Sequence, residues 1–189
     1  MMRQTLDAGL PELGLDLPES TRRILCDFGA AVIKQNEVMN LTAITQPDQV
    51  AKLHLLDSLT VLTAADLRGK QIIDVGCGAG FPGVPLAIAC PEAHVTLLDS
   101  LGKRMKWLEE ILPRLGVHAQ CVTARAEEAA AERRRFASEA CGGASGFSQA
   151  HAFSAPRASS FWLFSWPLQA QQNPPAPELR AQPVFEVER

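Results

Sequence analysis

The stretch DVGCGAGFPG, Asp74 to Gly83, decides the fold of this chain because it places four glycines within ten residues. The apolar run QII directly precedes this stretch, and the run of small apolar residues VPLAIAC directly follows it. Glycine costs backbone entropy in a folded element, so such a cluster requires a reason. A glycine-rich turn between a strand and a helix brings backbone N–H groups and a helix N-terminus close to a ligand.

Strand and helix patterns alternate on both sides of this turn. Short apolar runs predict buried strands over 71–75, 94–100 and 118–124. Longer periodic segments predict helices over 83–90 and 103–116, and a further helical pattern begins at 126. Strands that alternate with helices indicate parallel βαβ units in an open, doubly wound α/β sheet.

The chain before residue 69 shows helical patterns only. Apolar residues recur near helical spacing within 17–36, and a second helical pattern over 47–65 opens at Pro47. We therefore expect an N-terminal helical cap over 1–68, followed by a Rossmann-like cofactor-binding half over 69–132.

The composition is that of an ordinary globular protein. Apolar residues make up 47% and charged residues 21% of the 189 residues, and the net charge is -3. Contacts with RNA therefore require local basic patches rather than a uniformly basic surface. No apolar run reaches the roughly 18 residues of a membrane span, and the N-terminus lacks the apolar core of a signal peptide. We expect a cytoplasmic monomer that binds no membrane.

The five cysteines are scattered and form neither a CxxC motif nor a Cys/His pattern of metal ligands. We interpret them as free thiols in a reducing cytoplasm, where cysteine usually acts as a small buried hydrophobe. The sequence therefore predicts no metal site.

Three classes of ligand can be weighed against the glycine turn. A P-loop requires Lys and then Ser or Thr after its last glycine, but Val84 and Pro85 follow Gly83, which excludes it. A dinucleotide fits the formal GxGxxG match that starts at Gly78, but this match alone is weak and has Pro82 before its last glycine. An NAD-binding oxidoreductase domain stays as an alternative.

The third class, S-adenosylmethionine, fits the residues best. Its loop has the form acid-x-Gly-x-Gly-x-Gly, which the chain matches with Asp74, Gly76, Gly78 and Gly80. The methionine end of the cofactor carries an ammonium group, which the carboxylate of Asp74 would attract. Asp99, 25 residues later at the end of the next predicted strand, can accept hydrogen bonds from the ribose hydroxyls.

Longer motifs in the chain together resemble one enzyme family. They are, in order, MNLTAI, HLLDSL, DVGCGAGFPGVPLAIACP, LLDSLGKRMKWLEE and ARAEE. Over residues 15–132 the chain resembles the RsmG (GidB) family of bacterial 16S ribosomal RNA guanine-7-N methyltransferases. The resemblance implies S-adenosylmethionine as cofactor and a Rossmann-like methyltransferase fold with an N-terminal helical cap. It also implies methyl transfer to ring nitrogen 7 of a guanine in the 16S ribosomal RNA of the small ribosomal subunit.

By position, the resemblance assigns cofactor contacts to Gly76 and Phe81 in the loop, and to Ala126 and Glu127 after the third predicted strand. Phe81 is also a suitable apolar lid for the cofactor, and packing against the following helix explains it equally well. The backbone after the third strand is where N–H and C=O groups can read the edge of the adenine.

The implied reaction needs no catalytic side chain. Ring nitrogen 7 of guanine has a lone pair and no proton to lose, so in-line attack on the sulfonium methyl depends on positioning and not on a general base. His54, Asp57 and Ser58 share one face of the predicted helix, but nothing in the sequence resembles a nucleophile turn. We interpret His54 and Asp57 as lining the mouth of the cofactor or RNA site, or as ordinary polar residues of the helix.

Further candidates for substrate contact flank the cofactor motifs. Asn40 in MNLT either lies at the edge of the site or caps a loop. Lys103 and Arg104 follow Asp99 closely, near the end of a strand where ligands of such sheets bind. They are candidates for RNA contact, although a solvated helix face explains them equally well. We expect Trp107, on the same helix, in the core.

The sequence changes character after residue 132. The resemblance implies a fourth strand of the type Phe-Asp-x-Val beside the first, ending in Arg-Ala, but the chain reads RRRFASEACGGASG there. Lys and Asp are absent from residue 133 to the end. We therefore predict a sheet that is incomplete in its C-terminal half, an exposed edge on the first strand, and an aberrant, disordered tail over 133–189.

Three hypotheses about this tail stay open. A shift of reading frame near residues 133–137 predicts a chain that binds S-adenosylmethionine weakly and does not methylate RNA. A genuine, divergent tail would instead fold on a partner, with FWLFSW as its anchor. A non-catalytic remnant would bind only the cofactor or RNA.

Overall fold

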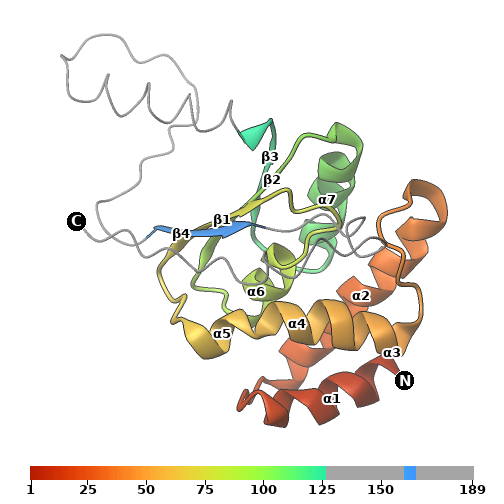
Figure 1. The fold of residues 1–189 in the computed structure, drawn as a ribbon, viewed down its shortest axis with the longest axis vertical. Helices are drawn as coiled ribbons and strands as arrows, with labels where there is room; N and C mark the ends of the chain where they lie inside the picture. The colour runs from red at the N-terminus through yellow and green to blue at the C-terminus, as the bar shows by residue number, and fades with distance from the viewer. Residues whose placement is uncertain (127–159, 165–189) are drawn as a thin grey trace, which may run out of the picture.

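A computed structural model describes residues 1–126 and the backbone of residues 160–164. Helices occupy the N-terminal part of the chain, and a parallel sheet with connecting helices follows (Figure 1). The buried apolar residues of both parts form one continuous cluster, so the helices and the sheet share a core. Within the described residues, no helix has the length and apolar character needed to cross a membrane.

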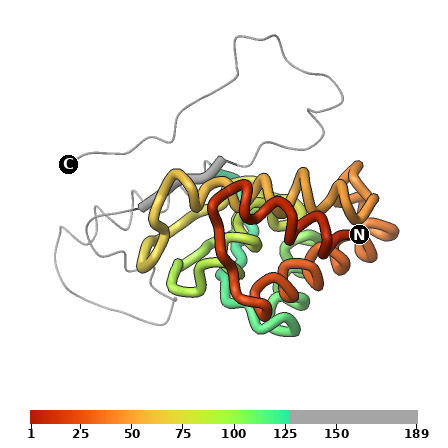
Figure 2. The backbone as a smooth tube through the Cα atoms, turned by 90° about the horizontal axis from the view of Figure 1, so that it is seen from below, coloured from red at the N-terminus to blue at the C-terminus, as the bar shows by residue number. Residues whose placement is uncertain are grey.

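The chain begins with a helix that the sequence patterns did not predict, α1 (Met2–Glu12). It lies across the helices that follow it (Figure 2), and its approach is close. A Cβ added at Gly9 would lie 2.3 Å from Cδ1 of Leu56, and one at Gly29 would lie 2.9 Å from Sδ of Met2. The glycines therefore allow α1 to pack directly onto its neighbours.

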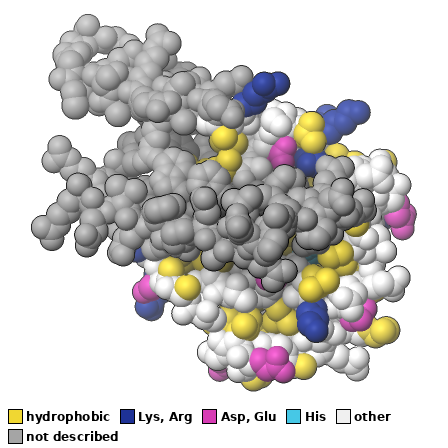
Figure 3. Space-filling view, in the orientation of Figure 1, with side chains coloured by type: hydrophobic (Ala, Val, Ile, Leu, Met, Phe, Trp, Pro, Cys, Tyr) yellow, Lys and Arg dark blue, Asp and Glu magenta, His cyan; other side chains and the backbone are white. Residues whose placement is uncertain are grey.

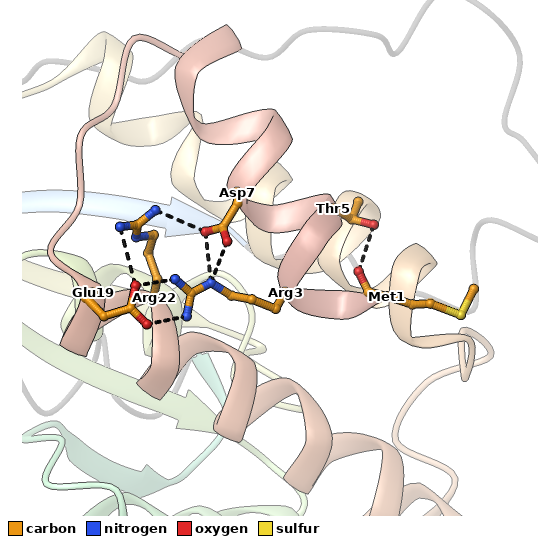
Figure 4. A network of polar contacts seen from close by, with 6 residues as sticks. All are labelled: Met1, Arg3, Thr5, Asp7, Glu19 and Arg22. Atoms are coloured by element: carbon orange, nitrogen blue, oxygen red, sulfur yellow. Dashed lines mark hydrogen bonds and ion pairs between the residues drawn. The ribbon is translucent and has the colours of Figure 1, made fainter.

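Ion pairs join α1 to α2 (Glu19–Met39) at the surface. Arg3 contacts Asp7 on its own helix, with 2.7 Å between Nε and Oδ2, and also contacts Glu19 on α2 (Figure 4). Arg22 of α2 contacts the same two acids, and its Nη1 lies 3.1 Å from Oδ1 of Asp7. The four side chains thus form an alternating network of charges between the two helices.

The predicted helix over 47–65 forms, but with an irregular centre. It comprises α3 (Pro47–Val50), the π-helical segment η1 (Ala51–Leu56), α4 (Asp57–Leu59) and α5 (Val61–Ala64). A π-helical segment rotates the residues after it relative to those before it. His54 and Ser58 are buried, whereas Asp57 is exposed. Of the three residues predicted to share one face, Asp57 therefore lies on the solvent side, whereas His54 and Ser58 point into the core.

The predicted strands and their connecting helices are present. Strands β1 (Gln71–Val75), β2 (His94–Asp99) and β3 (Gln120–Thr123) pair in parallel. Helix α6 (Gly83–Ala89) connects β1 to β2, and α7 (Gly102–Arg114) connects β2 to β3. Both crossovers run in the same direction along the sheet, so right-handed connections place α6 and α7 on one face. Helix α6 also contacts α2 and α4, and so lies between the sheet and the N-terminal helices (Figure 1).

A fourth strand, β4 (Ser160–Phe164), pairs in parallel with β1 and gives the strand order β3-β2-β1-β4. The prediction of an exposed edge on β1 is therefore wrong. The run SFWLF is apolar and aromatic, which suits a strand, but it is too short to show a period of its own. The unpaired backbone groups of β1 provide the partner that the run needs. The rest of the predicted aberrant tail over 133–189 lies outside the described residues.

Candidate cofactor site

The glycine loop leaves β1 and crosses over the carboxyl end of β2. The N–H groups of Gly76 and Cys77 donate to the carbonyl oxygen of Leu98, with N···O distances of 2.7 and 3.2 Å. Gly76, Gly78 and Gly80 all have positive φ, at 75°, 55° and 97°. Residues with a Cβ rarely adopt this conformation, which explains the alternating glycines that the sequence shows.

Asp99, at the carboxyl end of β2, is tied to the loop by its side chain. Its Oδ2 accepts a hydrogen bond from the N–H of Gly78 at 3.0 Å, and its Oδ1 accepts one from the N–H of Leu101 at 2.8 Å. Nη1 of Arg104 lies 3.9 Å from Oδ2. Each carboxylate oxygen has two lone pairs and can accept a further hydrogen bond. Asp99 can therefore hold the loop and bind a hydroxyl at the same time.

Asp74, near the carboxyl end of β1, is fully buried behind the loop. Its Oδ2 accepts a hydrogen bond from the N–H of Gly83 at 2.8 Å, and its Oδ1 finds no partner among the described residues. Burial raises the pKa of Asp74 to about 8, the N–H of Gly83 opposes this shift, and the charge of Asp99 adds to it. An unpartnered oxygen on a buried carboxyl group is costly, and a cationic donor would satisfy it.

The loop is open at Gly78 and crowded at Gly80 and Gly83. Among the described residues, a Cβ built on Gly78 would have only the carbonyl oxygen of Gly76 within 4 Å, at 3.9 Å. A Cβ on Gly80 would lie 2.7 Å from Cγ2 of Val84, and one on Gly83 would lie 2.7 Å from Oδ2 of Asp74. The space beside Gly78, next to the carboxylate of Asp99, is therefore where a ligand can approach the backbone.

Phe81 lies in the same loop and is nearly buried, with 7% of its surface exposed. Its ring stacks on His54, with 4.7 Å between centroids, and lies tilted against Phe28 at 5.3 Å. Trp107 of α7 in turn stacks on Phe28; it was predicted in the core and is half-buried against it. A role of Phe81 as a lid over the cofactor stays a prediction.

The candidates for substrate contact lie in different environments. Asn40 is exposed and ends α2 in the left-handed conformation, with φ 49°, which is the capping geometry. His54 is 3% exposed, and its Nε2 lies 2.9 Å from Oγ1 of Thr42. Asp57 and Lys103 are exposed, and Arg104 is half-buried beside Asp99.

The remaining predicted cofactor residues follow β3. Ala126 is exposed, and the N–H of Ala124 donates to the carbonyl oxygen of Asp99 at 3.2 Å, which holds this end of β3 beside the site. Glu127 lies outside the described residues. Of the five cysteines, Cys77 and Cys90 are buried and Cys26 and Cys121 half-buried, all four with free thiols, and Cys141 lies outside the described residues.

Three residues near the site were missed in the sequence. Thr42 contacts His54, and the side-chain oxygen of Asn36 accepts a hydrogen bond from the N–H of Thr42 at 2.8 Å. Thr42 lies in the MNLTAI motif, so the sequence could have pointed to it, whereas Asn36 on α2 lies in none of the motifs. Leu101 is 50% exposed and directly follows the Asp99-Ser100 pair, so it offers apolar surface beside the carboxylate.

Basic side chains lie near the same end of the sheet. Several Lys and Arg side chains lie at the top of Figure 3, over the start of α7 and the end of β3 as these appear in Figure 1. Because strands β1, β2 and β3 are parallel, their carboxyl ends bring the two acids, the glycine loop and these basic residues to one edge.

Comparisons with known proteins relate this sequence to one family of enzymes. A family model described as GidB, rRNA small subunit methyltransferase G, matches residues 21–141. The ribosomal RNA small subunit methyltransferase G of Serratia proteamaculans (strain 568) is 42% identical over 132 residues, which is 69% of this chain and 63% of that protein. The protein of the same name from Coxiella burnetii (strain Dugway 5J108-111) is 44% identical over 116 residues, which is 61% of this chain and 56% of that protein.

A third relative of the same name, from Stutzerimonas stutzeri (strain A1501), is 42% identical over 126 residues, which is 66% of this chain and 59% of that protein. The chain thus spans between 56% and 63% of the length of these three relatives. Strand β4 lies beyond the part that the family model matches. The match covers the glycine loop, both acids and the helices that pack on them, and the chain therefore belongs to the GidB family, rRNA small subunit methyltransferase G.

Proposed function

We propose that the edge formed by Asp74, the glycine loop and Asp99 binds S-adenosylmethionine. The observation that carries this proposal is the buried Oδ1 of Asp74, which has no partner among the described residues; in the same loop, Gly78 leaves open space beside Asp99. The cofactor has a cationic amino group at one end and ribose hydroxyls near its centre. The first can donate a hydrogen bond to Oδ1 of Asp74, and its positive charge would favour ionisation of that buried carboxyl group, while the second can use the spare lone pairs of Asp99.

The residues fit this cofactor better than they fit a dinucleotide. A pyrophosphate favours N–H groups and positive charge, whereas two carboxyl groups flank this loop. Leu101 offers apolar surface next to Asp99, which suits the adenosine portion of the ligand. When bound, S-adenosylmethionine would supply a methyl group on a sulfonium centre.

The family name and the site together support methyl transfer to ring nitrogen 7 of a guanine in 16S ribosomal RNA. This nitrogen needs no general base, so the protein must mainly hold the base in line with the methyl group. His54 fits this view, because its Nε2 is engaged by Thr42 and its ring is buried, which leaves it no exposed nitrogen for proton transfer. Lys103 and the exposed Asn40 and Asp57 stay candidates for RNA contact.

The test compares binding with transfer on the full chain. S-adenosylmethionine should raise the melting temperature and bind measurably in calorimetry, whereas NAD should do neither. Protection by NAD and not by S-adenosylmethionine would overturn the proposed site. Asp99→Asn should weaken binding because the amide nitrogen cannot accept a hydrogen bond from a hydroxyl.

The transfer of a labelled methyl group to small ribosomal subunits that lack this modification tests the reaction. Transfer to ring nitrogen 7 of a guanine supports the methyltransferase. Binding without transfer supports the second candidate, a cofactor- or RNA-binding remnant.

A further inference from the structure

Four rings from four different segments form a continuous column through the core. His54 of η1 stacks on Phe81 of the glycine loop at 4.7 Å, with an interplanar angle of 18°. Phe81 lies tilted against Phe28 of α2 at 5.3 Å, and Phe28 stacks on Trp107 of α7 at 6.5 Å. The N-terminal helices therefore contact the cofactor loop through the ring of Phe81.

At one end of this column of rings, His54 forms a polar contact with Thr42, and both side chains are buried. Thr42 is 8% exposed and His54 is 3% exposed, with 2.9 Å between Oγ1 and Nε2. Oγ1 of Thr42 also accepts a hydrogen bond from the N–H of Ile44 at 3.0 Å. The ring also hydrogen-bonds to the Leu53 backbone, and burial lowers the pKa of His54, so we assign the ring as neutral with Nε2 accepting the hydroxyl hydrogen of Thr42.

The turn that carries Thr42 is itself held in place. The N–H of Thr42 donates to Oδ1 of Asn36 at 2.8 Å, which connects the turn to α2. On the other side, the carbonyl oxygen of His54 accepts a hydrogen bond from Oγ of Ser58 at 2.5 Å, inside the irregular part of its helix. Hydrogen bonds in a buried site fix orientation as well as distance, which a purely apolar contact would not do.

We propose that Thr42 and His54 are positioning residues for the glycine loop. The hydroxyl of Thr42 fixes the plane of the imidazole, and the imidazole holds Phe81 and the backbone around it in the conformation that receives a ligand. Preorganisation of this kind lowers the cost of ordering the loop when the ligand binds. The link to S-adenosylmethionine rests on the proposed function, whereas the ordering of the loop does not.

Hydrogen exchange of the loop amides in the full chain, without any ligand, tests the ordering. Thr42→Val keeps the shape of the side chain and removes the hydroxyl, and should speed exchange of the Cys77–Val84 peptide about tenfold, the factor of one lost hydrogen bond. The amides of α7 should not change. Thr63→Val is the matched control, because Thr63 is exposed and its hydroxyl donates only to the carbonyl oxygen of Thr60. It should leave the loop unchanged.

Two further variants separate the hydrogen bond from packing. Thr42→Ser restores the hydroxyl without the methyl group and should return loop exchange to the wild-type rate. His54→Phe keeps a ring against Phe81 but removes Nε2, and should speed loop exchange as Thr42→Val is expected to. It provides the test on its own if Thr42→Val does not fold. Equal loop exchange in wild type, His54→Phe and any folded Thr42→Val would overturn the proposal.

Calorimetry with S-adenosylmethionine is the second readout. Thr42→Val should weaken binding several-fold and Thr42→Ser should not. If the wild type binds no S-adenosylmethionine, the proposed function fails, and the exchange rates still decide whether Thr42 and His54 order the loop. Faster loop exchange with unchanged affinity would overturn the link between loop order and binding.

Discussion

Asp74 and Gly83 face each other across the glycine loop, and each restricts the other. The N–H of Gly83, the first residue of α6, donates to Oδ2 of Asp74 at 2.8 Å. A Cβ at Gly83 would lie 2.7 Å from that oxygen, 3.0 Å from Cβ of Asp74 and 2.3 Å from Cδ2 of the fully buried Leu97. The glycine is therefore required for close approach and not for an unusual φ.

Gly83→Ala should destabilise the chain by about 2–3 kcal/mol, because the new methyl group overpacks a buried site and pushes on the carboxyl group of Asp74. Urea unfolding followed by circular dichroism measures this change. Gly102→Ala is the matched control, since Gly102 is also the first residue of a helix and its added Cβ would meet, in the described part of the chain, only Cγ2 of Thr123, at 3.6 Å. Equal stabilities of the two variants would contradict the close approach that the structure shows.

Gly78→Ala should abolish ligand binding at a small cost in stability. Its φ of 55° is left-handed, which costs about 1–2 kcal/mol for alanine, and its Cβ would fill the open space beside Asp99. Gly14→Ala provides the comparison, because Gly14 has a φ of 67°, no atom near its added Cβ, and a position after α1. Calorimetry should show loss of S-adenosylmethionine binding in Gly78→Ala alone, with similar melting temperatures for both. Wild-type affinity in Gly78→Ala would exclude a ligand at this position.

Asp74→Asn should change how stability depends on pH. Burial raises the pKa of Asp74 to about 8 in the folded chain, against 3.8 for an ordinary aspartate. The folded state thus binds the proton more tightly, so the contribution of this group to stability is full below about pH 4 and is lost as the pH rises toward 8. The asparagine side chain does not titrate, so the variant does not lose stability in this way as the pH rises. The loss expected for the wild type is on the order of a few kcal/mol in the free energy of unfolding.

Urea unfolding of wild type and Asp74→Asn at pH 5 and pH 8.5 checks this prediction. The stability difference between the two proteins should shift in favour of the variant at the higher pH. A difference that stays the same at both pH values would show that Asp74 is ionised throughout in the folded chain.

His54→Gln should remove a loss of stability that the wild type shows in acid. Burial lowers the pKa of His54, although its hydrogen bond to the Leu53 backbone and the charge of Asp57 both oppose this shift. The neighbours described from other segments, Thr42 and Phe81, carry no charge. A group with a lowered pKa binds its proton more weakly when folded, so its contribution to stability is lost as the pH falls below 6.5.

Thermal unfolding between pH 7.5 and pH 5 measures this effect in wild type, His54→Gln and His118→Gln. His118 is exposed, so its replacement should leave the acid-dependent fall of the melting temperature in place. A fall of the same size in His54→Gln would assign the acid sensitivity to other groups.

Strand β4 should protect the edge of β1. Trp162 pairs with Ile73 at the centre of the ladder, and proline at this position fixes φ and crowds the preceding residue, which disturbs the extended strand. Hydrogen exchange of the Gln71–Val75 peptide should be about tenfold faster in Trp162→Pro, a factor that one ladder hydrogen bond supplies. Trp162→Val keeps the N–H and a good strand former, and should exchange much more slowly than the proline variant. Wild-type exchange in Trp162→Pro would contradict the pairing.

Much of the site could be predicted from the sequence because local rules position it. The run QIIDV, the alternating glycines and the run HVTLLD each predict one element. Parallel pairing then brings Asp74, Gly78 and Asp99 to one edge without any knowledge of packing. The same local rules explain why α7 ends at Arg114, two residues before Gly116, whose φ is 67°.

Longer-range contacts decided the rest. The sequence places His54 and Asp57 three residues apart, but the π-helical segment and the core determine that only His54 is buried. Thr42 meets His54 from a separate turn, and Ser160–Phe164 pairs with β1 across many residues of intervening chain. Local sequence determines which backbone conformations have low energy. The tertiary structure decides which side chains and strand edges are removed from water, and these groups must then find partners within the protein.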